Sequence, residues 1–263
     1  MKATFYSPCN WLIQAWLAAV LLLFSIPVAV ATAEDSTDAR FAENARPRYV
    51  EAVNRFRADG DNPTNAAQLA CSCYDAADFA TNDSERAVLA REGISACRGS
   101  IVQHPDYAPT HYYLAMNLGQ LAKTEILSAL SLLPVMEQEF KVAAALDPLY
   151  DYAGPERNLG LLYLQAPRIA SIGSHRKARE FLESAANLAP DYPENQLNLA
   201  EAYLKWNEPE NAGAALQLLD DGWVKAQVEF SGDAWAQSWE DWTTRREDAE
   251  KKLDKIHQNK PVK

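Results

Sequence analysis

The cysteine thiols of this sequence are candidate groups for redox chemistry or metal binding. Three cysteines follow residue 33, namely Cys71, Cys73 and Cys97. A redox or metal centre needs a CxxC pair or further Cys and His ligands, and the sequence supplies neither. Residues 64–80 and 84–102 have the pattern of two helices joined by a turn, which would bring Cys97 opposite Cys71 or Cys73. We expect one structural disulfide from Cys97 to either Cys71 or Cys73, and one spare thiol.

Histidines and carboxylates are the other candidates for chemistry. The four histidines are scattered without ligand spacing, at His104, His111, His175 and His257. Neither the motifs of serine hydrolases and zinc proteases nor the phosphate-binding glycine loops occur. Glu and Asp are abundant, as in any acidic helical protein with solvent-facing side chains. The sequence therefore predicts no catalytic residue, no metal site and no cofactor, and a protein that is not an enzyme.

A repeated spacing of small and large apolar residues predicts the helices that would carry these side chains. Leu159-Gly160-x-x-Tyr163 is followed by Ala178, Leu182, Ala185 and Pro190, the signature of a tetratricopeptide repeat of ~34 residues. The next repeat brings Leu199-Ala200-x-x-Tyr203, then Ala212 and Leu216. Upstream, Leu114-Ala115-x-x-Leu118 is followed by Phe140, Ala143 and Pro148. Since one repeat cannot bury its apolar face alone, the expected fold is all-α, an α-solenoid of stacked helical hairpins over 63–221.

The repeats predict a binding surface on their first helices. In such repeats the concave wall comes mainly from positions two, five, nine and twelve of each first helix. These positions hold Tyr112, Met116, Arg157, Leu161, Leu164, Leu197, Glu201 and Leu204. A water-facing apolar strip of this kind favours a groove for a ligand or partner. The alternative is that insertions or a terminal helix cover the strip.

Arg157 has two interpretations within this wall. Its guanidinium could bind a ligand carboxylate with two hydrogen bonds. It could equally pair with Glu201 on the adjacent repeat and serve only packing.

Two insertions interrupt the repeats. One lies after Tyr163, in a loop that Pro167 and Gly173 punctuate and that carries Arg168, Ile169 and Ile172. The other lies within 121–133, ends before Pro134, and has a helical pattern with one apolar side. Such loops either form a binding face or pack over the side of the solenoid.

Several of these motifs together resemble a known family. They are Gly154-Pro155-x-Arg157, Leu159-Gly160-x-x-Tyr163, Ala166-Pro167, Ser171-Ile172-Gly173 and Tyr192-Pro193-Glu194-Asn195. The sequence is similar here to the T component associated with some TRAP transporters, the TatT family of periplasmic repeat proteins. The likeness covers roughly 64–220 and is firm over 147–205.

The resemblance implies a periplasmic accessory protein that assembles as a homotrimer. It further implies contact with the solute-binding protein of the transporter and passage of a small, apolar ligand. Two other functions fit an exported repeat protein: a carrier of a small apolar ligand, and a general envelope assembly scaffold.

The two ends of the chain have patterns of their own. Residues 1–33 read as a cleaved signal peptide, with Lys2, an apolar run and Ala31-Thr32-Ala33 as the cleavage site. An uncleaved anchor is the alternative, but the apolar core is short for a span of ~20 residues. Cys9 precedes the apolar run, so it does not fit a lipoprotein cysteine. We expect an exported, periplasmic protein that is soluble after cleavage.

The segments that flank the repeats are predicted to cap them. Within 34–62, the part before Pro47 is polar and expected to be disordered, and 48–58 forms a short capping helix. Within 222–263, a short apolar linker precedes a capping helix with Trp235, Trp239 and Trp242 on one face, followed by a loose tail. The net charge of −11 disfavours nucleic acid and anionic membrane surfaces as partners.

Overall fold

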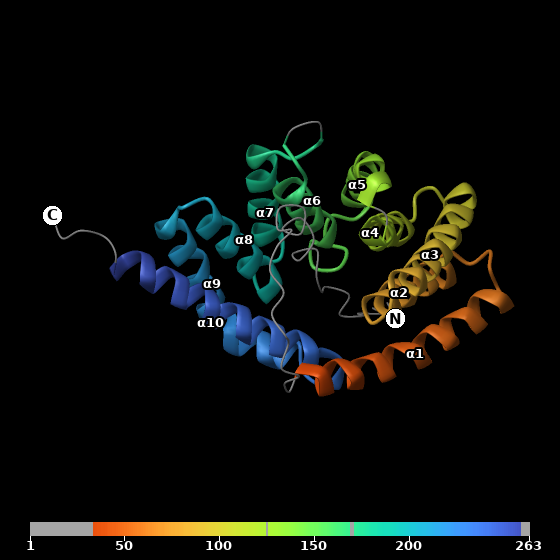
Figure 1. The fold of residues 1–263 in the computed structure, drawn as a ribbon, viewed down its shortest axis with the longest axis horizontal. Helices are drawn as coiled ribbons and strands as arrows, with labels where there is room; N and C mark the ends of the chain where they lie inside the picture. The colour runs from red at the N-terminus through yellow and green to blue at the C-terminus, as the bar shows by residue number, and fades with distance from the viewer. Residues whose placement is uncertain (1–33, 125, 169–170, 259–263) are drawn as a thin grey trace. The chain divides into compact units, whose positions relative to one another are not determined.

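The computed structural model describes residues 34–258 apart from 125, 169 and 170 (Figure 1). The predicted signal peptide and Ile169 lie outside the described residues. Throughout the described ranges all regular elements are helices and consecutive helices pack together, so the prediction of an all-α fold is confirmed. None of the described helices is both long enough and apolar enough to cross a membrane.

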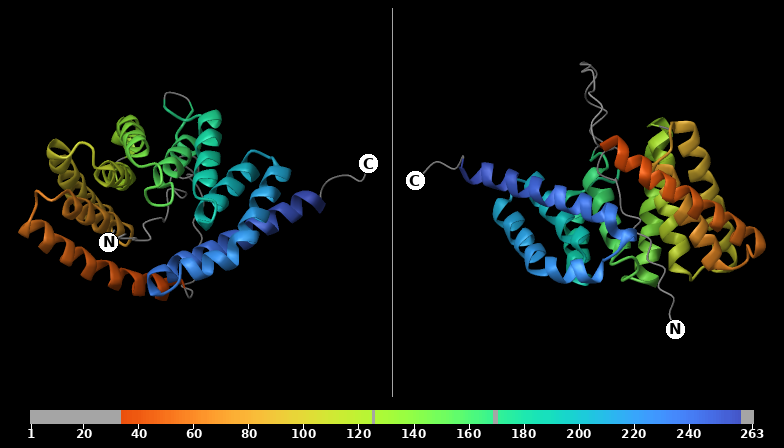
Figure 2. Two further views of the ribbon diagram at one scale, coloured as in Figure 1. Left: turned by 180° about the vertical axis from the view of Figure 1, so that it is seen from behind. Right: turned by 90° about the horizontal axis from the view of Figure 1, so that it is seen from below.

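The described chain forms two compact units. The N-terminal unit contains 34–147 and the loop Gln165–Gly173, and the C-terminal unit contains Pro148–Leu164 and 174–258. The helices of the N-terminal unit are α1 (Glu34–Ala58), α2 (Pro63–Asp78), α3 (Asp83–Gln103), α4 (Ala108–Thr124) and α5 (Ile126–Leu146). Within it α2 and α3 lie side by side in both views of Figure 2, and α4 packs on both of them.

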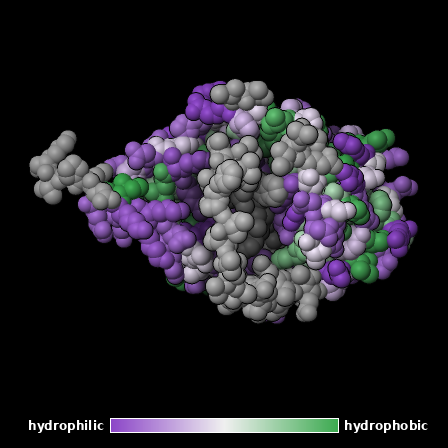
Figure 3. Space-filling view, viewed as in Figure 1, coloured by the Kyte–Doolittle hydropathy of each residue, from purple (hydrophilic) through white to green (hydrophobic). Residues whose placement is uncertain are grey.

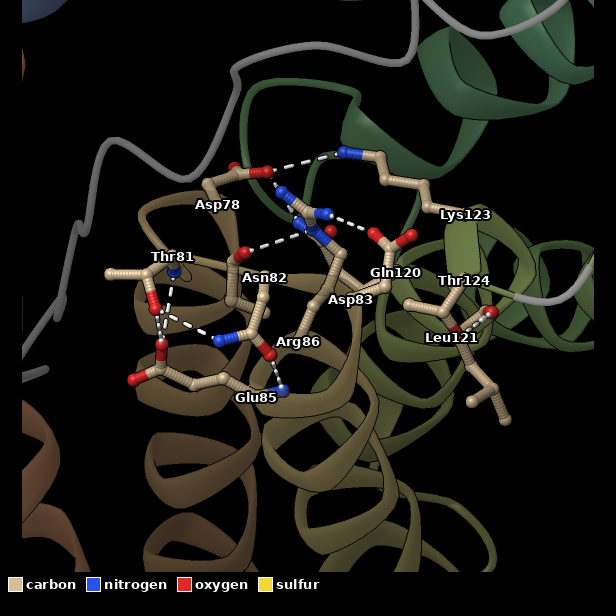
Figure 4. A network of polar contacts seen from close by, with 11 residues as sticks. Asp78, Thr81, Asn82, Asp83, Glu85, Arg86, Gln120, Leu121, Lys123 and Thr124 are labelled. Carbon is tan, nitrogen blue, oxygen red and sulfur yellow. Dashed lines mark hydrogen bonds and ion pairs between the residues drawn. The ribbon is translucent and has the colours of Figure 1, made fainter.

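The turn between α2 and α3 is closed by side chains. Asn82 accepts a hydrogen bond of 2.9 Å from the backbone N–H of Glu85, and this caps α3. The Glu85 carboxylate reaches back and accepts from the backbone N–H and the hydroxyl of Thr81, at 2.9 and 2.8 Å (Figure 4). The bond from Glu85 satisfies an N–H group that the first turn of a helix leaves unpaired, and the bonds from Thr81 fix the residue that precedes the cap.

A buried carboxylate ties the end of α2 to α4. Asp78 accepts a hydrogen bond from Gln120 and forms an ion pair of 3.2 Å with Lys123, as Figure 4 shows. Burial raises the pKa of Asp78, and the charge of Lys123 and the bond from Gln120 oppose this rise. One turn earlier on α4, Asn117 donates to the carbonyl of Ala70 on α2 at 2.8 Å.

A glycine makes room for that asparagine. A Cβ atom at Gly93 of α3 would lie 2.5 Å from Oδ1 of Asn117. Any larger residue at this position would therefore displace the Asn117 amide and disturb its hydrogen bond to Ala70.

The C-terminal unit repeats the same kind of hairpin. Its elements are α6 (Gly154–Gln165), α7 (His175–Leu188), α8 (Pro193–Lys205), α9 (Pro209–Glu229), the short 3₁₀ turn η2 (Asp233–Trp235) and α10 (Ala236–Gln258). A Cβ atom at Gly160 would lie 2.6 Å from Cγ of Leu182, so the small residue of α6 receives the large residue of α7. Helix α10 packs against α8 and α9. Its outer surface is mostly hydrophilic (Figure 3).

Three boundaries differ from the sequence-based expectation. Helix α1 begins at Glu34 and passes through Pro47, so the prediction of disorder before Pro47 is wrong; Ala45 is buried there. Helix α5 likewise passes through Pro134. Helix α9 continues through Gly222 to Glu229, where a linker was expected, because Ala226 is buried and Trp223 packs edge-on against Trp239. Tertiary packing outweighs local helix-breaking signals at these positions.

Candidate functional site

Most residues of the predicted wall are buried. Tyr112 and Met116 lie in the core of the N-terminal unit, where Tyr112 packs edge-on against Phe140 at 5.9 Å between ring centres. In the C-terminal unit Arg157, Leu161 and Leu197 are buried as well. These side chains therefore pack inside the helical hairpins, and they do not form the expected water-facing strip. The remaining members, Leu164, Glu201 and Leu204, are half-buried.

The insertion loop after α6 folds back on itself. Gly173 donates a hydrogen bond of 3.1 Å to the carbonyl of Pro167, and a Cβ atom at Gly173 would lie 2.1 Å from the carbonyl oxygen of Ala166. Only glycine fits this closure. Arg168 is exposed, and Pro167 and Ile172 are half-buried.

Arg157 is the centre of a buried polar cluster in the C-terminal unit. Its guanidinium donates to the side chain of Asn195 at 2.9 Å and to the carboxylate of Asp151 at 3.0 Å. It also donates to the backbone carbonyls of Asp151 and Tyr152, at 3.1 and 3.0 Å. The carboxylate partner expected from a ligand or from Glu201 is thus supplied by Asp151, while Glu201 binds Arg245.

This cluster holds a strained turn immediately before α6. Asp151, Tyr152 and Ala153 have φ values of 50°, 54° and 62°, three successive non-glycine residues in the left-handed region. This region costs roughly 1–2 kcal/mol per residue for L-amino acids. Asn195 supports the turn from α8, because it donates to the carbonyl of Tyr152 at 3.0 Å as well as to two carbonyls at the end of α7.

Aromatic rings cover the strained turn. Tyr152 stacks on Tyr192 with ring centres 4.5 Å apart and planes 13° apart. The guanidinium of Arg157 lies 5.1 Å from the centre of the Tyr192 ring. Phe230 and Trp235 contact Tyr152 edge-on, at 5.1 and 6.2 Å. Two motifs that carry the family resemblance, those at 154–157 and 192–195, therefore meet at one place in the structure.

A second arginine, half-buried, joins α8 to α10. Arg245 donates to Glu194 at 2.8 Å and to Asp241 at 3.0 Å through one nitrogen. It donates to Glu201 at 2.9 and 3.1 Å through its other two nitrogens. A further bond of 2.6 Å reaches Oδ1 of Asn198. All five N–H donors of this guanidinium are therefore used.

The carboxylates around Arg245 respond differently to their surroundings. Burial would raise the pKa of Glu194, but the charge and hydrogen bond of Arg245 outweigh burial, and the pKa is lowered. For Asp241 burial dominates and raises the pKa from 3.8 to about 6, against the charge of Arg245 and with the charge of Glu194. Glu194 is thus fixed as an anion, whereas Asp241 is the group that can gain a proton.

The cysteines depart from the expected disulfide. In the described part of the chain Cys71, Cys73 and Cys97 are all buried, and no disulfide joins any two of them. Burial raises the thiol pKa of both Cys73 and Cys97. Cys73 packs with Leu69 and Ala96 in the core, so these residues act as small apolar side chains between α2 and α3.

The sequence contains a signal for Arg245 that lies outside the known motifs. Arg245 falls three residues after Trp242 and four before Ala249, on the buried stripe of α10. A charged residue on such a stripe predicts buried partners. The left-handed turn carries no comparable signal, because Tyr152 and Ala153 are of types that rarely adopt positive φ and Asp151 alone, which tolerates it, does not predict the turn.

The sequence has no match among protein-family models or curated proteins. The structure of the C-terminal unit offers two candidate features: the Arg157 cluster with its aromatic cover at the starts of α6 and α8, and the half-buried Leu164 and Leu204 near the ends of the same helices.

Proposed function

We propose that this chain is an exported helical-repeat adaptor of the tetratricopeptide type that serves a TRAP-type transport system by contacting its solute-binding protein. The observation that carries the proposal is the meeting of Gly154-Pro155-x-Arg157 with Tyr192-Pro193-Glu194-Asn195 around one buried arginine. These are the motifs on which the likeness to the TatT family depends, and their shared packing supports a common architecture. Assembly as a homotrimer belongs to the same proposal.

The hairpin geometry also supports this function. Gly160 receives Leu182 at the position where the repeat pattern places a small residue against a large one. Stacked hairpins of this type present extended surfaces for other proteins. Because Tyr112, Leu161 and Leu197 are buried, the contact surface is expected to use the half-buried apolar members of the wall, Leu164 and Leu204. Glu201, the third half-buried member, is paired with Arg245.

A crosslinking pull-down from the native envelope fraction tests the proposal. The tagged full chain should capture the solute-binding protein of a transporter, identified by mass spectrometry. Leu164→Glu and Leu204→Glu should abolish capture, because each introduces a charge into the proposed contact. Leu218→Glu is the matched control: Leu218 is 58% exposed on α9, outside the wall, and its replacement should leave capture intact.

The possible outcomes separate the functions. Capture that is lost only in the two wall variants, with unchanged melting temperatures, supports the adaptor. Recovery of the protein alone, as an oligomer, contradicts the adaptor and favours carriage of a small apolar ligand. Recovery of envelope proteins unrelated to transport favours an assembly scaffold.

A further inference from the structure

The contact between α8 and α10 carries an unbalanced set of buried charges. Three carboxylates, those of Glu194, Glu201 and Asp241, share the single guanidinium of Arg245. The side chains of Arg245, Glu194 and Asp241 are 16%, 6% and 14% exposed, so water screens the excess negative charge poorly.

The hydrogen bonds identify the carboxylate that is held least firmly. Glu194 accepts from Arg245, from the side-chain amide of Asn198 at 3.1 Å and from the indole N–H of Trp242 at 2.8 Å. Glu201 accepts two bonds from Arg245. Asp241 accepts one bond, from the nitrogen that Arg245 also directs to Glu194. Hydrogen bonds to an ionised carboxylate stabilise the ionised form. Asp241 accepts the fewest of these bonds, so its ionised form is stabilised least among the three carboxylates.

The charges on the neighbouring elements contribute unequally. Helix α8 brings the two anions Glu194 and Glu201 to the cluster, and the charge of Arg157 on α6 acts on Glu194. On α9 the charge of Asp220 is compensated by Arg246 of α10, at 2.7 Å. Asp233 of the turn η2 is exposed to solvent. Arg245 is the cation that acts directly on Asp241.

We propose that the seam between α8 and α10 is a pH-sensitive contact, in which Asp241 loses a proton as the pH rises from mildly acidic to neutral and α10 is then held less firmly. The direction follows from linkage. A carboxyl group with a folded-state pKa of about 6, against 3.8 ordinarily, binds more protons in the folded state between these values. The stability of the seam is then highest at the acidic end of this window and declines as the pH rises through about 6.

Tryptophan fluorescence can observe this seam selectively. After residue 33 the tryptophans are Trp206, Trp223, Trp235, Trp239 and Trp242, all in the C-terminal unit. In the full chain with Trp11→Phe and Trp16→Phe, urea unfolding followed by fluorescence therefore reports this unit alone. From pH 7.5 to pH 5.5 the folded-to-unfolded ratio should rise roughly fourfold, part of the ~100-fold that a shift of about two pKa units allows over the whole window.

Two matched variants test whether Asp241 causes this pH dependence. Asp241→Asn should remove most of the pH dependence and raise the ratio at pH 7.5, because it removes the excess charge. Asp254→Asn, an exposed position on the same helix, should behave like the parent chain. A pH dependence that persists unchanged in Asp241→Asn overturns the proposal, as does a parent unit that becomes more stable on going to pH 7.5.

A measurement without substitution at the seam covers the case in which Asp241→Asn does not fold. Carboxyl ¹³C NMR of the parent chain, with the signal of Asp241 assigned separately from that of buried Asp78, should show Asp241 titrating with a midpoint near 6. Titration of Asp241 near the ordinary aspartate value of ~4 overturns the proposal.

Discussion

Arg157 at the start of α6 donates a hydrogen bond of 2.9 Å to Asn195 at the start of α8, 38 residues later in the chain. The same asparagine donates to the carbonyls of Ala185 and Ala189 at the end of α7. One pair of side chains therefore connects three helices and the strained turn at 151–153. Loss of this pair of side chains should therefore destabilise the whole C-terminal unit.

Replacing Arg157 by Lys should strongly destabilise the C-terminal unit. The ammonium group keeps the charge but cannot serve Asp151, Tyr152 and Asn195 together. Each buried acceptor left without its hydrogen bond costs about 1–3 kcal/mol. Urea unfolding followed by tryptophan fluorescence measures the loss. Arg176→Lys, at a side chain that is 79% exposed, should change the free energy of unfolding by less than ~0.5 kcal/mol. Equal effects of both variants would contradict the role given to Arg157.

Adding one methyl group at Gly160 should separate α6 from α7. The new Cβ atom would lie 2.6 Å from Cγ and 3.0 Å from the backbone nitrogen of Leu182, and such overpacking costs about 1–3 kcal/mol. Gly222→Ala in α9 is the control, because no atom lies within 4 Å of the added Cβ atom and helix propensity alone should stabilise by about 0.5–1 kcal/mol. Calorimetry on both variants tests the contrast. A stabilising effect of Gly160→Ala would refute the close approach.

The pair of His111 and Glu139 should make the N-terminal unit less stable at alkaline pH. Nδ1 of His111 lies 2.6 Å from Oε2 of Glu139, and Nε2 lies 2.8 Å from the carbonyl oxygen of Pro105. The hydrogen bond with Glu139 raises the pKa of His111, and burial opposes this rise. The stabilisation is complete below ~6.5, the pKa in the unfolded chain, and is lost as the pH rises through the folded-state value.

The variant Glu139→Gln tests this dependence. Calorimetry should find the parent chain more stable than Glu139→Gln at pH 6, and the difference should shrink at pH 8.5. NMR titration of His111 should find a lower pKa in the variant than in the parent. A stability difference that is the same at both pH values would argue against a charged His111.

The three cysteines should resist thiol reagents until the protein unfolds. Their burial keeps reagents away, and the raised pKa of Cys73 and Cys97 disfavours the reactive thiolate. Alkylation followed by mass spectrometry should label Cys71, Cys73 and Cys97 in denaturant and leave them almost unlabelled in the folded chain. Peptides linked by a disulfide from Cys97 to Cys71 or Cys73 would restore the sequence-based expectation.

The hairpins were predictable from sequence because their packing is local. The small and large residues of the repeat pattern, such as Gly160 and Leu182, meet where the spacing places them. Helix boundaries at Asn62 and Asn82 were predictable for the same reason, since both cap the helix that follows them. Pro47 and Gly222 were misleading because each interrupts only one turn of a helix that its neighbours stabilise.

The candidate site was predictable only in part. The motifs at 154–157 and 192–195 identified the right residues, but their spacing suggested an open wall, whereas burial and hydrogen bonding place Arg157 in the interior. The left-handed turn and the charge imbalance around Arg245 depend on contacts between distant segments. Glu194 and Arg245 are separated by 51 residues, and no local pattern relates them.

The turn at 151–153 has a consequence for the order in which the nascent chain can fold. Arg157 leaves the ribosome well before Asn195, so the left-handed residues lack half of their support while α6 and α7 are being made. The strain at Asp151, Tyr152 and Ala153 opposes a settled α6–α7 hairpin during that interval. We expect this unit to become protease-resistant in one step after α8 has emerged, and not repeat by repeat during synthesis.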